Sequence, residues 1–213
     1  MTQAGTAHRE KGHRWFAAMW DLISAPAERK YGRKTVRPRL MGETDGRVLE
    51  IGAGTGHSFS FYPTEAHVVA TDPDPHMLDR AKKRLADLGV THIELRQASA
   101  EALPFVNGSF DHVVSSMVLC SVHDVPRALA EARRVLKPSG TFRFWEHVRN
   151  DESRFWGSAQ DCITPVWRWF GAGCHPNRRT EHAIEEAGFG IEWIEWIRDV
   201  PFEPVIYGVA RLP

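Results

Sequence analysis

Residues 47 to 57 read Arg-Val-Leu-Glu-Ile-Gly-Ala-Gly-Thr-Gly-His, an apolar run that stops at three glycines spaced two apart. This pattern predicts a buried strand that enters a tight loop before a helix. Glycine is needed in such a loop where a side chain would block a positive φ or keep the backbone away from a ligand. A second apolar run, residues 68 to 72, ends at Asp72. If the two strands are parallel neighbours, Asp72 lies beside the loop, where its carboxylate can accept hydrogen bonds from both hydroxyls of a ribose.

The glycine spacing also indicates which nucleoside cofactor the loop suits. A dinucleotide-binding loop has glycines at its first, third and sixth positions, which here are Gly52, Gly54 and His57. His57 breaks that pattern, and the Lys-Ser/Thr ending of a phosphate-binding loop is missing as well. S-adenosylmethionine carries an adenosine and an amino-acid tail but no phosphate. The loop therefore favours S-adenosylmethionine over NAD or a nucleoside triphosphate.

Length and composition limit the class of protein. A chain of 213 residues is long enough for one full α/β domain and too short for two comfortable ones. Acidic and basic residues number 27 each, so no net charge recruits nucleic acid. Three cysteines without paired spacing predict no disulfide framework and a reducing compartment. Because no apolar run approaches the roughly twenty residues of a membrane span and no secretory signal is visible, we expect a cytoplasmic protein without membrane association. The oligomeric state is left open.

The alternation of strand and helix patterns predicts the fold class. We expect a single α/β domain over residues 46–213, built as a Rossmann-like, doubly wound sheet of about seven mostly parallel strands. The last two strands are expected to form an antiparallel hairpin at one edge. The predicted strands are 47–51, 68–72, 93–97, 111–119, 141–146, 191–197 and 205–210, and the spacing of 191–197 also fits a helix. The predicted helices between them are 59–62, 75–88, 125–136 and 180–187, with a turn at 137–140.

Residues 1–45 are expected to form a helical lid or docking segment ahead of this domain. Apolar residues recur at helical spacing from His13 to Ser24 and give that helix one apolar face, which includes Trp20. Docking on the core or closing over the cofactor is favoured over an interfacial helix on a membrane, because basic residues flank the stripe without dominating its polar face. The basic stretch 30–39 is interpreted as a solvated surface without a ligand.

A parallel sheet binds its ligands beyond the carboxyl ends of its strands, where the strand order reverses. By this count the ligand edge carries the glycine loop, Asp72, Glu101, Ser116 and the pair Glu146-His147.

Several stretches, taken jointly, are similar to a known family. They are residues 48–56, 72, 101–105, 110–111 and 134–140, and they resemble the class I S-adenosylmethionine-dependent methyltransferases. Further stretches are similar to the methyltransferase-like thiol S-methyltransferases, whose animal members are membrane-associated. These are residues 61–63, 72–73, 119–122, 146–148, 173–174, 177–180 and 206–208.

The resemblance implies a cofactor site and a product, S-adenosylhomocysteine. The glycine loop would wrap the methionine part, Asp72 would hold the ribose, and the segment around Ala100-Glu101 would lie along the adenine. The full implied set is Glu50, Gly52, Ala53, Gly54, Thr55, Gly56, Asp72, Pro73, Met77, Ser99, Ala100, Glu101, Ser116 and Met117. Two features depart from the family: Ser99 replaces the usual acid, so the adenine amino group would bond to a hydroxyl or to backbone, and the hydrophobic N-terminal anchor of the animal relatives is absent.

The protein itself has to supply little of the chemistry of methyl transfer. A sulfonium is already an activated leaving group, so the enzyme must align a small-molecule acceptor and exclude water. A thiol acceptor must also lose a proton, and because thiols have pKa values of about 8.5, a weak base suffices. His147 is the first candidate base and His175 the second, although each can also be a packing residue or a hydrogen-bond anchor. Trp20, Trp145 and Cys174 are expected to line the acceptor pocket, although aromatic residues at such spacing are more often core.

The sequence predicts no metal site and leaves two rival functions. Cys174-His175 with Cys162 lacks the four patterned ligands of structural zinc. The favoured function is methyl transfer to a thiol or hydrogen sulfide. The rivals are O-, N- or C-methylation of a quinone-like or natural-product acceptor, and non-catalytic binding of S-adenosylmethionine.

Overall fold

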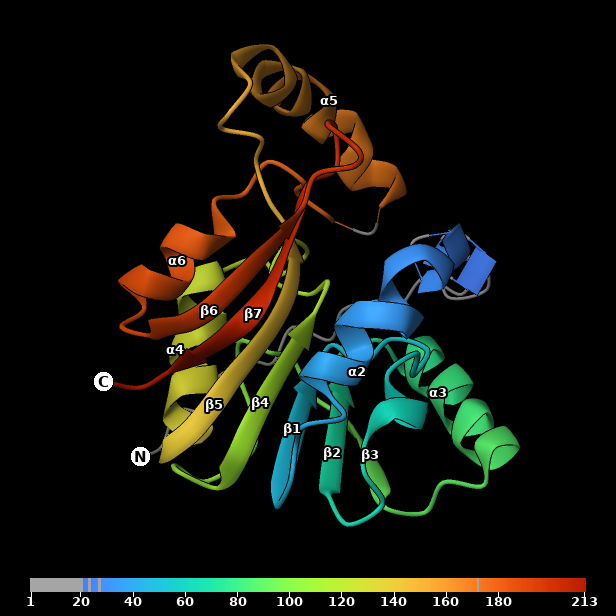
Figure 1. Cartoon of the computed structure of the whole chain (residues 1–213). Coiled ribbons are helices and arrows are strands. Elements are labelled where there is room, and N and C mark those ends of the chain that lie inside the picture. The colour runs from blue at the N-terminus through green and yellow to red at the C-terminus, as the bar shows by residue number, and fades with distance from the viewer. Residues whose placement is uncertain (1–20, 23, 27, 172) are drawn as a thin grey trace, which may run out of the picture.

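The computed structural model describes residues 21–22, 24–26, 28–171 and 173–213. Seven strands form one sheet in the order β3-β2-β1-β4-β5-β7-β6 (Figure 1). The strands are β1 (Arg47–Ile51), β2 (His67–Asp72), β3 (Ile93–Gln97), β4 (Phe110–Ser116), β5 (Leu136–His147), β6 (Gly190–Ile197) and β7 (Val205–Arg211). The first five strands pair in parallel, and β7 pairs antiparallel with both β5 and β6. This arrangement confirms the predicted fold class and the C-terminal hairpin at one edge.

The strand order reverses between β1 and β4. From β1 the chain continues outward to β2 and β3, then returns to place β4 and β5 on the other side of β1. This switch point leaves room beyond the carboxyl ends of β1 and β4, where sheets of this kind bind ligands.

Helical segments lie on both faces of the sheet and above its carboxyl edge. They are the π-helix η1 (Glu28–Val36), α2 (Arg37–Leu40), the 3₁₀ turn η2 (Phe59–Phe61), α3 (Pro75–Leu88), α4 (Val125–Val135), α5 (Arg154–Phe170) and α6 (Thr180–Glu186). The start of α3 is fixed by Asp74, whose side chain accepts a hydrogen bond from the backbone N–H of His76, and Gly89 ends it in the left-handed region. Asp124 caps α4 in the same way.

Two apolar cores cover the two faces of the sheet, because side chains alternate along each strand. Leu49 and Ile51 of β1 pack with α4 and α6 on one face. Val48 packs on the other face with η1, α2 and α3. The same alternation in β5 sends Phe144 into the first core and Trp145 into the second.

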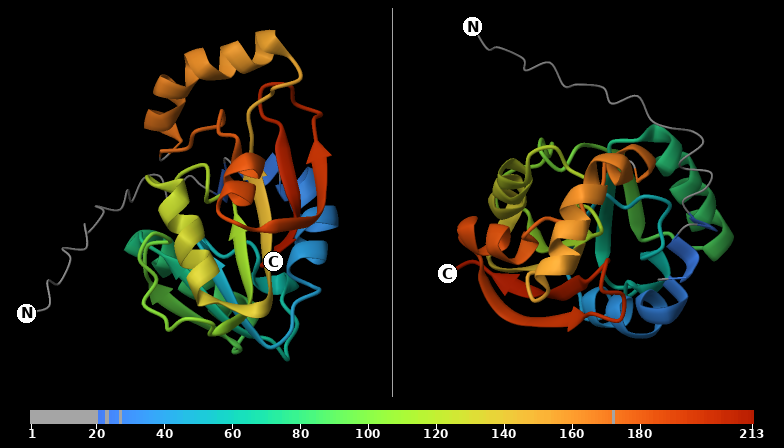
Figure 2. Two further views of the ribbon diagram at one scale, coloured as in Figure 1. Left: turned by 90° about the vertical axis from the view of Figure 1, so that its left-hand side faces the viewer. Right: turned by 90° about the horizontal axis from the view of Figure 1, so that it is seen from above.

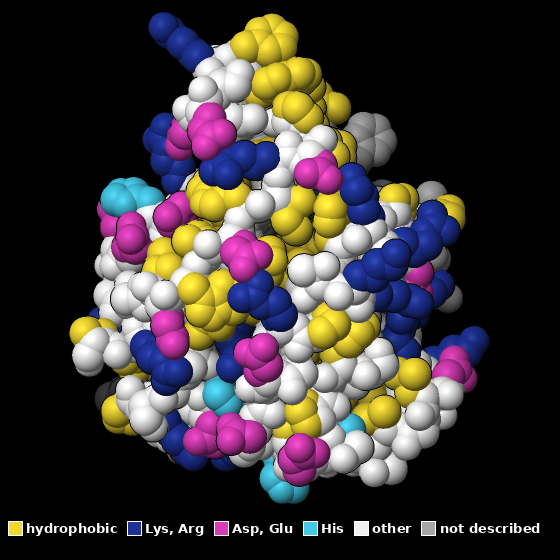
Figure 3. Space-filling view, viewed as in Figure 1, with side chains coloured by type: hydrophobic (Ala, Val, Ile, Leu, Met, Phe, Trp, Pro, Cys, Tyr) yellow, Lys and Arg dark blue, Asp and Glu magenta, His cyan; other side chains and the backbone are white. Residues whose placement is uncertain are grey.

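The helix α5 lies apart from both cores, above the end of the sheet (Figures 1 and 2). Several of its apolar side chains are exposed, with Trp169 at 77%. Figure 3 shows hydrophobic side chains gathered over this end of the molecule. Among the helices that the structure describes, none has both the length and the apolar character needed to cross a bilayer.

The structure differs from the sequence prediction in three places. The predicted turn 137–140 lies within β5, at an irregularity of the strand pairing between Leu136, which pairs with Phe110, and Thr141, which pairs with His112. The predicted strand 111–119 ends at Ser116, because Met117 adopts a positive φ of 60°. The basic stretch 30–39 is not simply solvated, since Arg37 is buried and its guanidinium is paired with the carboxylate of Glu28. Most of the predicted helix 13–24 lies outside the described residues.

Candidate functional site

The loop after β1 has the backbone geometry that its glycines suggest. Gly52 and Gly56 have φ values of 60° and 82°. A Cβ at Gly52 would lie 2.5 Å from Val118 Cγ2, and one at Gly56 would lie 2.2 Å from Phe59 Cε2. Both positions therefore require glycine, for the positive φ and for the close approach of the next segment.

Asp72 lies beside this loop, at the end of β2. Its Oδ2 accepts the N–H of Gly54 at 2.9 Å, and its Oδ1 accepts the N–H of Asp74 at 2.9 Å. The backbone is also joined there, since Ala53 N–H donates to the carbonyl of Thr71 at 2.8 Å. The two strand ends are thus held together as the sequence predicts, and the ribose-binding role of Asp72 remains a prediction.

Glu50 provides a buried acceptor next to the loop. Its carboxylate is 1% exposed, and its Oε2 has no hydrogen-bond partner within the described part of the chain. Burial raises the pKa of Glu50 to about 7, against the opposing effects of Ser58 and the Arg37 guanidinium. A buried carboxylate oxygen without a donor fits a ligand that carries an ammonium group, which S-adenosylmethionine does.

The segment expected along the adenine makes several hydrogen bonds within the protein. Glu101 Oε1 accepts the backbone N–H groups of His123 and Asp124 at 2.7 and 2.9 Å, which fixes the entry to α4. Ser99 Oγ accepts the N–H of Glu101 at 3.3 Å, and Ala100 is buried. Pro73 accepts a hydrogen bond from Gln97 through its carbonyl.

The end of β4 contributes the remaining predicted cofactor residues. Ser116 Oγ is buried without a hydrogen-bond partner among the described residues, and Met117 N–H donates to the carbonyl of Trp145 at 2.7 Å. Met77 is buried on α3. The unpartnered hydroxyl of Ser116 is a second polar atom at this edge that is suited to a polar ligand.

Asp21 connects the segment before η1 to the glycine loop. The hydroxyl of Thr55 donates to Asp21 Oδ1 at 2.5 Å, and His57 Nε2 lies 2.9 Å from the same oxygen. Arg84 Nη2 of α3 lies 3.1 Å from it. The N-terminal segment therefore contacts the loop that follows β1.

Glu146 organises the turn after β4, a role that the sequence did not reveal. Its buried carboxylate accepts the hydroxyl of Ser115 at 2.5 Å and the N–H of Val118 at 3.1 Å. The N–H of Cys120 lies 3.4 Å from its other oxygen. Burial raises the pKa of this carboxyl group.

Three side chains from distant segments meet beside this turn. Cys120 follows β4, His147 ends β5, and Cys174 lies in the loop after α5. Their ligand atoms all lie within 4.8 Å of one another, with 3.7 Å between Cys174 Sγ and His147 Nδ1. The contact between the two thiols raises the pKa of Cys120 and lowers that of Cys174. Burial acts to lower the pKa of His147, but the hydrogen bond with Cys120 and nearby negative charges leave it raised.

The other predicted pocket residues have different surroundings. His175 holds the backbone of Cys120, with its N–H 2.7 Å and its Nδ1 3.3 Å from that carbonyl. Burial and the Arg178 charge lower the pKa of His175. Trp145 is buried against the Arg37 guanidinium, 5.3 Å from the ring centroid, and its Nε1 has no partner among the described residues. Trp20 lies outside the described residues.

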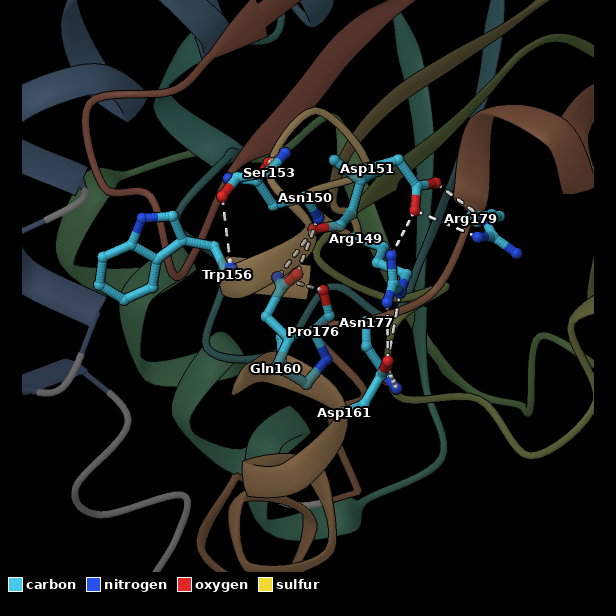
Figure 4. Close-up of polar contacts among 11 residues, drawn as sticks. Arg149, Asn150, Asp151, Ser153, Trp156, Gln160, Asp161, Pro176, Asn177 and Arg179 are labelled. Carbon is cyan, nitrogen blue, oxygen red and sulfur yellow. Dashed lines mark hydrogen bonds and ion pairs between the residues drawn. The ribbon is translucent and has the colours of Figure 1, made fainter. Parts of the chain in front are cut away.

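A polar network anchors α5 and the Cys174 loop to the end of β5 (Figure 4). Gln160 Nε2 lies 3.0–3.1 Å from the carbonyls of Val148, Pro176 and Phe202. Arg149 pairs with Asp161 at 2.7 Å, and Asn177 donates to the same carboxylate at 2.9 Å. These contacts position the loop that carries Cys174.

Comparison with known proteins agrees with this geometry. Residues 49–144 match the family model described as "Methyltransferase domain". The chain is 36% identical to thiol S-methyltransferase TMT1B of Rattus norvegicus over 76% of this chain and 69% of the relative. It is also 36% identical to human thiol S-methyltransferase TMT1A over the same shares.

Solved structures share the fold at low sequence identity. YcgJ of Bacillus subtilis superimposes with a TM-score of 0.63 at 18% identity, covering 79% of this chain and 93% of that one. An S-adenosylmethionine-dependent methyltransferase of Thermotoga maritima does so with a TM-score of 0.65 at 21% identity, covering 94% and 100%. The switch-point loop, the seven-stranded sheet and these similarities lead to one conclusion: the chain belongs to the thiol S-methyltransferase family and is an S-adenosylmethionine-dependent methyltransferase.

Proposed function

We propose that this enzyme transfers a methyl group from S-adenosylmethionine to the sulfur of a small thiol or of hydrogen sulfide. The observation that carries the proposal is the position of His147, which ends β5 beside two thiols, next to the turn that packs on the glycine loop. The relatives at 36% identity are thiol S-methyltransferases, which supports the same acceptor class.

The proposed cofactor contacts follow from the partners described above. The bound cofactor supplies the methyl group on a sulfonium, an activated leaving group. Glu50 holds the ammonium group, Asp72 holds the ribose hydroxyls, and Gly52 to Gly56 give the backbone room to lie along the methionine part. Ser99, Ala100 and Glu101 line the adenine through backbone atoms and the Ser99 hydroxyl. Alignment of the acceptor with the methyl carbon accounts for up to about 7–11 kcal/mol of barrier lowering.

The proposed proton acceptor is His147. A thiol has a pKa of about 8.5, so a neutral imidazole beside it can accept its proton. His175 is assigned the second role of fixing the Cys120 turn, because its ring nitrogen faces a backbone carbonyl. Cys174 is proposed to bound the acceptor pocket beside His147, whereas Trp145 packs in the second core.

The lid and the location are part of the same proposal. Asp21 contacts Thr55 and His57, which supports closure over the glycine loop by the part of the segment around this residue, whereas η1 and α2 dock on the sheet. A cytoplasmic location is supported by the three cysteines, all of which are free.

Assays with matched thiols and phenols test the acceptor class. We expect thiols to be methylated and phenols to react far more slowly. His147→Gln is expected to lower kcat for thiols by about 30-fold at pH 7, with recovery as the pH rises toward 8.5 and the thiol ionises unaided. His76→Gln, on α3, is the matched control and is expected to leave the rate unchanged. Phenols reacting as fast as thiols would refute the acceptor class, and a pH-independent loss would refute the role of His147.

A further inference from the structure

We propose that Cys120, His147 and Cys174 form a zinc-binding site whose fourth coordination position takes the acceptor thiol. The sequence prediction of no metal considered only Cys162, Cys174 and His175, and of these the fold brings only Cys174 into the cluster. The inference rests on the proposed thiol acceptor. It adds a metal site and a second way of stabilising the thiolate.

The spacing of the three side chains is close to that of a zinc site. Atoms bound to one tetrahedral zinc at about 2.0–2.3 Å lie about 3.5–3.8 Å from each other. Cys174 Sγ and His147 Nδ1 are 3.7 Å apart, and no pair in the cluster exceeds 4.8 Å. Small side-chain rotations therefore suffice to close the site around an ion.

The donor set and the burial favour zinc over a hard cation. Two thiolates and one imidazole are soft to borderline ligands, which select zinc rather than magnesium or calcium. Cys120 and Cys174 are 1% and 7% exposed. Two thiolates neutralise the charge of Zn²⁺, so the loaded site places no net charge in this buried region.

The backbone around the ligands is held in place before any metal binds. Cys120 is fixed by Glu146 at its N–H and by His175 at its carbonyl. The backbone carbonyl of His147 accepts the hydroxyl of Thr180 at 3.1 Å. Arg178 ties the Cys174 loop to the Cys120 turn by donating to the carbonyls of Leu119 and Val122. Such support is what outer-shell partners give to metal ligands.

The three side chains leave one coordination position for the acceptor. Among the residues that the structure describes, only three side chains contribute to the cluster, whereas zinc binds four ligands. Val118, two residues before Cys120, packs on Gly52 of the cofactor loop. The cluster is therefore close to that loop, and three protein ligands with one open position are typical of catalytic zinc.

The step balances without an oxidant or reductant. The thiol binds zinc through sulfur and releases its proton to solvent. The sulfur lone pair then forms the new S–C bond while the S–C bond of the sulfonium breaks, which leaves a neutral thioether and neutral S-adenosylhomocysteine. With zinc bound, His147 is a ligand and the metal favours the thiolate; in the metal-free protein the imidazole keeps that task.

Metal titration of the full chain tests the site. The protein is stripped with a chelator and titrated with Zn²⁺ against a chromophoric competitor, and Co²⁺ is used to record thiolate-to-metal charge-transfer absorption. We expect one Zn²⁺ per chain and a two-thiolate cobalt spectrum. Cys120→Ser and Cys174→Ser are expected to weaken binding by at least about 100-fold. Cys162→Ser, which changes an exposed cysteine of α5, is the control and should bind as the wild type does.

The outcomes separate this inference from the proposed function. No stoichiometric Zn²⁺, or equal binding in all three cysteine variants, overturns the zinc site. Zinc that binds as expected while thiol methylation is the same with and without it overturns the acceptor position. If neither form methylates thiols, the proposed function fails, whatever the metal titration shows. A wild-type melting temperature that rises with Zn²⁺, without the same rise in Cys174→Ser, confirms binding to the folded protein even where a variant is less stable.

Discussion

Glu50 is a single residue whose burial makes stability depend on pH. Its pKa is raised to about 7 in the folded protein, from 4.5 in the unfolded chain. A raised carboxyl pKa contributes stability that is fully present below about pH 4.5 and lost as the pH rises through 7. We therefore expect Glu50 to cost the ligand-free protein about 3 kcal/mol of unfolding free energy across that window.

Urea unfolding at a series of pH values measures this cost. The histidines His57 and His112 have lowered pKa values because of burial, so they contribute in the opposite direction. The informative quantity is the difference between the wild type and Glu50→Gln. That difference should grow in favour of the variant between pH 4.5 and 7, and parallel curves would contradict the assignment.

At the scale of one element, α5 depends on a few polar contacts for its position. Its exposed apolar side chains pack on little of the domain, whereas buried Gln160 reaches three carbonyls at 3.0–3.1 Å. Gln160→Leu removes the donor and leaves buried carbonyls unpaired, at about 1–3 kcal/mol of stability. We expect faster amide exchange in the loop 173–179, measured by hydrogen exchange, with strands β1 and β4 unchanged.

Ser158→Ala is the control for that experiment, because Ser158 is an exposed residue of the same helix. Its exchange should match that of the wild type. If Gln160→Leu slowed exchange or left it unchanged in the loop, the anchoring role of Gln160 would be wrong.

The elements also show which parts of the fold can be predicted from local patterns. β1 is an apolar run that stops before the glycines, and β2 is an apolar run that ends at Asp72. The predicted bounds of both strands are therefore nearly correct. The first residues of β5 were predicted as a turn because Lys137-Pro138-Ser139-Gly140 has turn composition. Pairing of Leu136 with Phe110 decides the outcome instead. That contact joins residues far apart in sequence, which no local pattern contains.

For the whole molecule, local patterns predict the cofactor half of the site but not the cluster beside it. The glycine loop and Asp72 follow neighbouring strands, so a rule about parallel strands was enough to place them together. The Cys120, His147 and Cys174 cluster combines three segments, one of which depends on the anchoring of α5. The sequence identified His147 and Cys174 singly, but it could not show that they meet Cys120.

Cofactor binding should stabilise the whole sheet, because the ligand binds residues at the ends of β1, β2 and β4 that come together only in the folded chain. At 100 times its Kd, S-adenosylmethionine should add about 2.7 kcal/mol. For a chain of this length that corresponds to a rise in Tm of about 5–10 °C.

Asp72→Asn tests whether cofactor binding stabilises the protein through Asp72. An amide at this position turns one acceptor into a donor facing the N–H of Gly54 or Asp74, so both the loop and the ribose contact are lost. We expect a lower Tm without ligand and little further rise with it. Asp79→Asn makes the same chemical change on the exposed side of α3 and should keep the full shift. The loss of a charge-assisted hydrogen bond costs about 1.5–3 kcal/mol, which is most of the stabilisation that the cofactor-induced rise in Tm measures. If Asp72→Asn kept the full rise in Tm, the ribose would have to bind elsewhere.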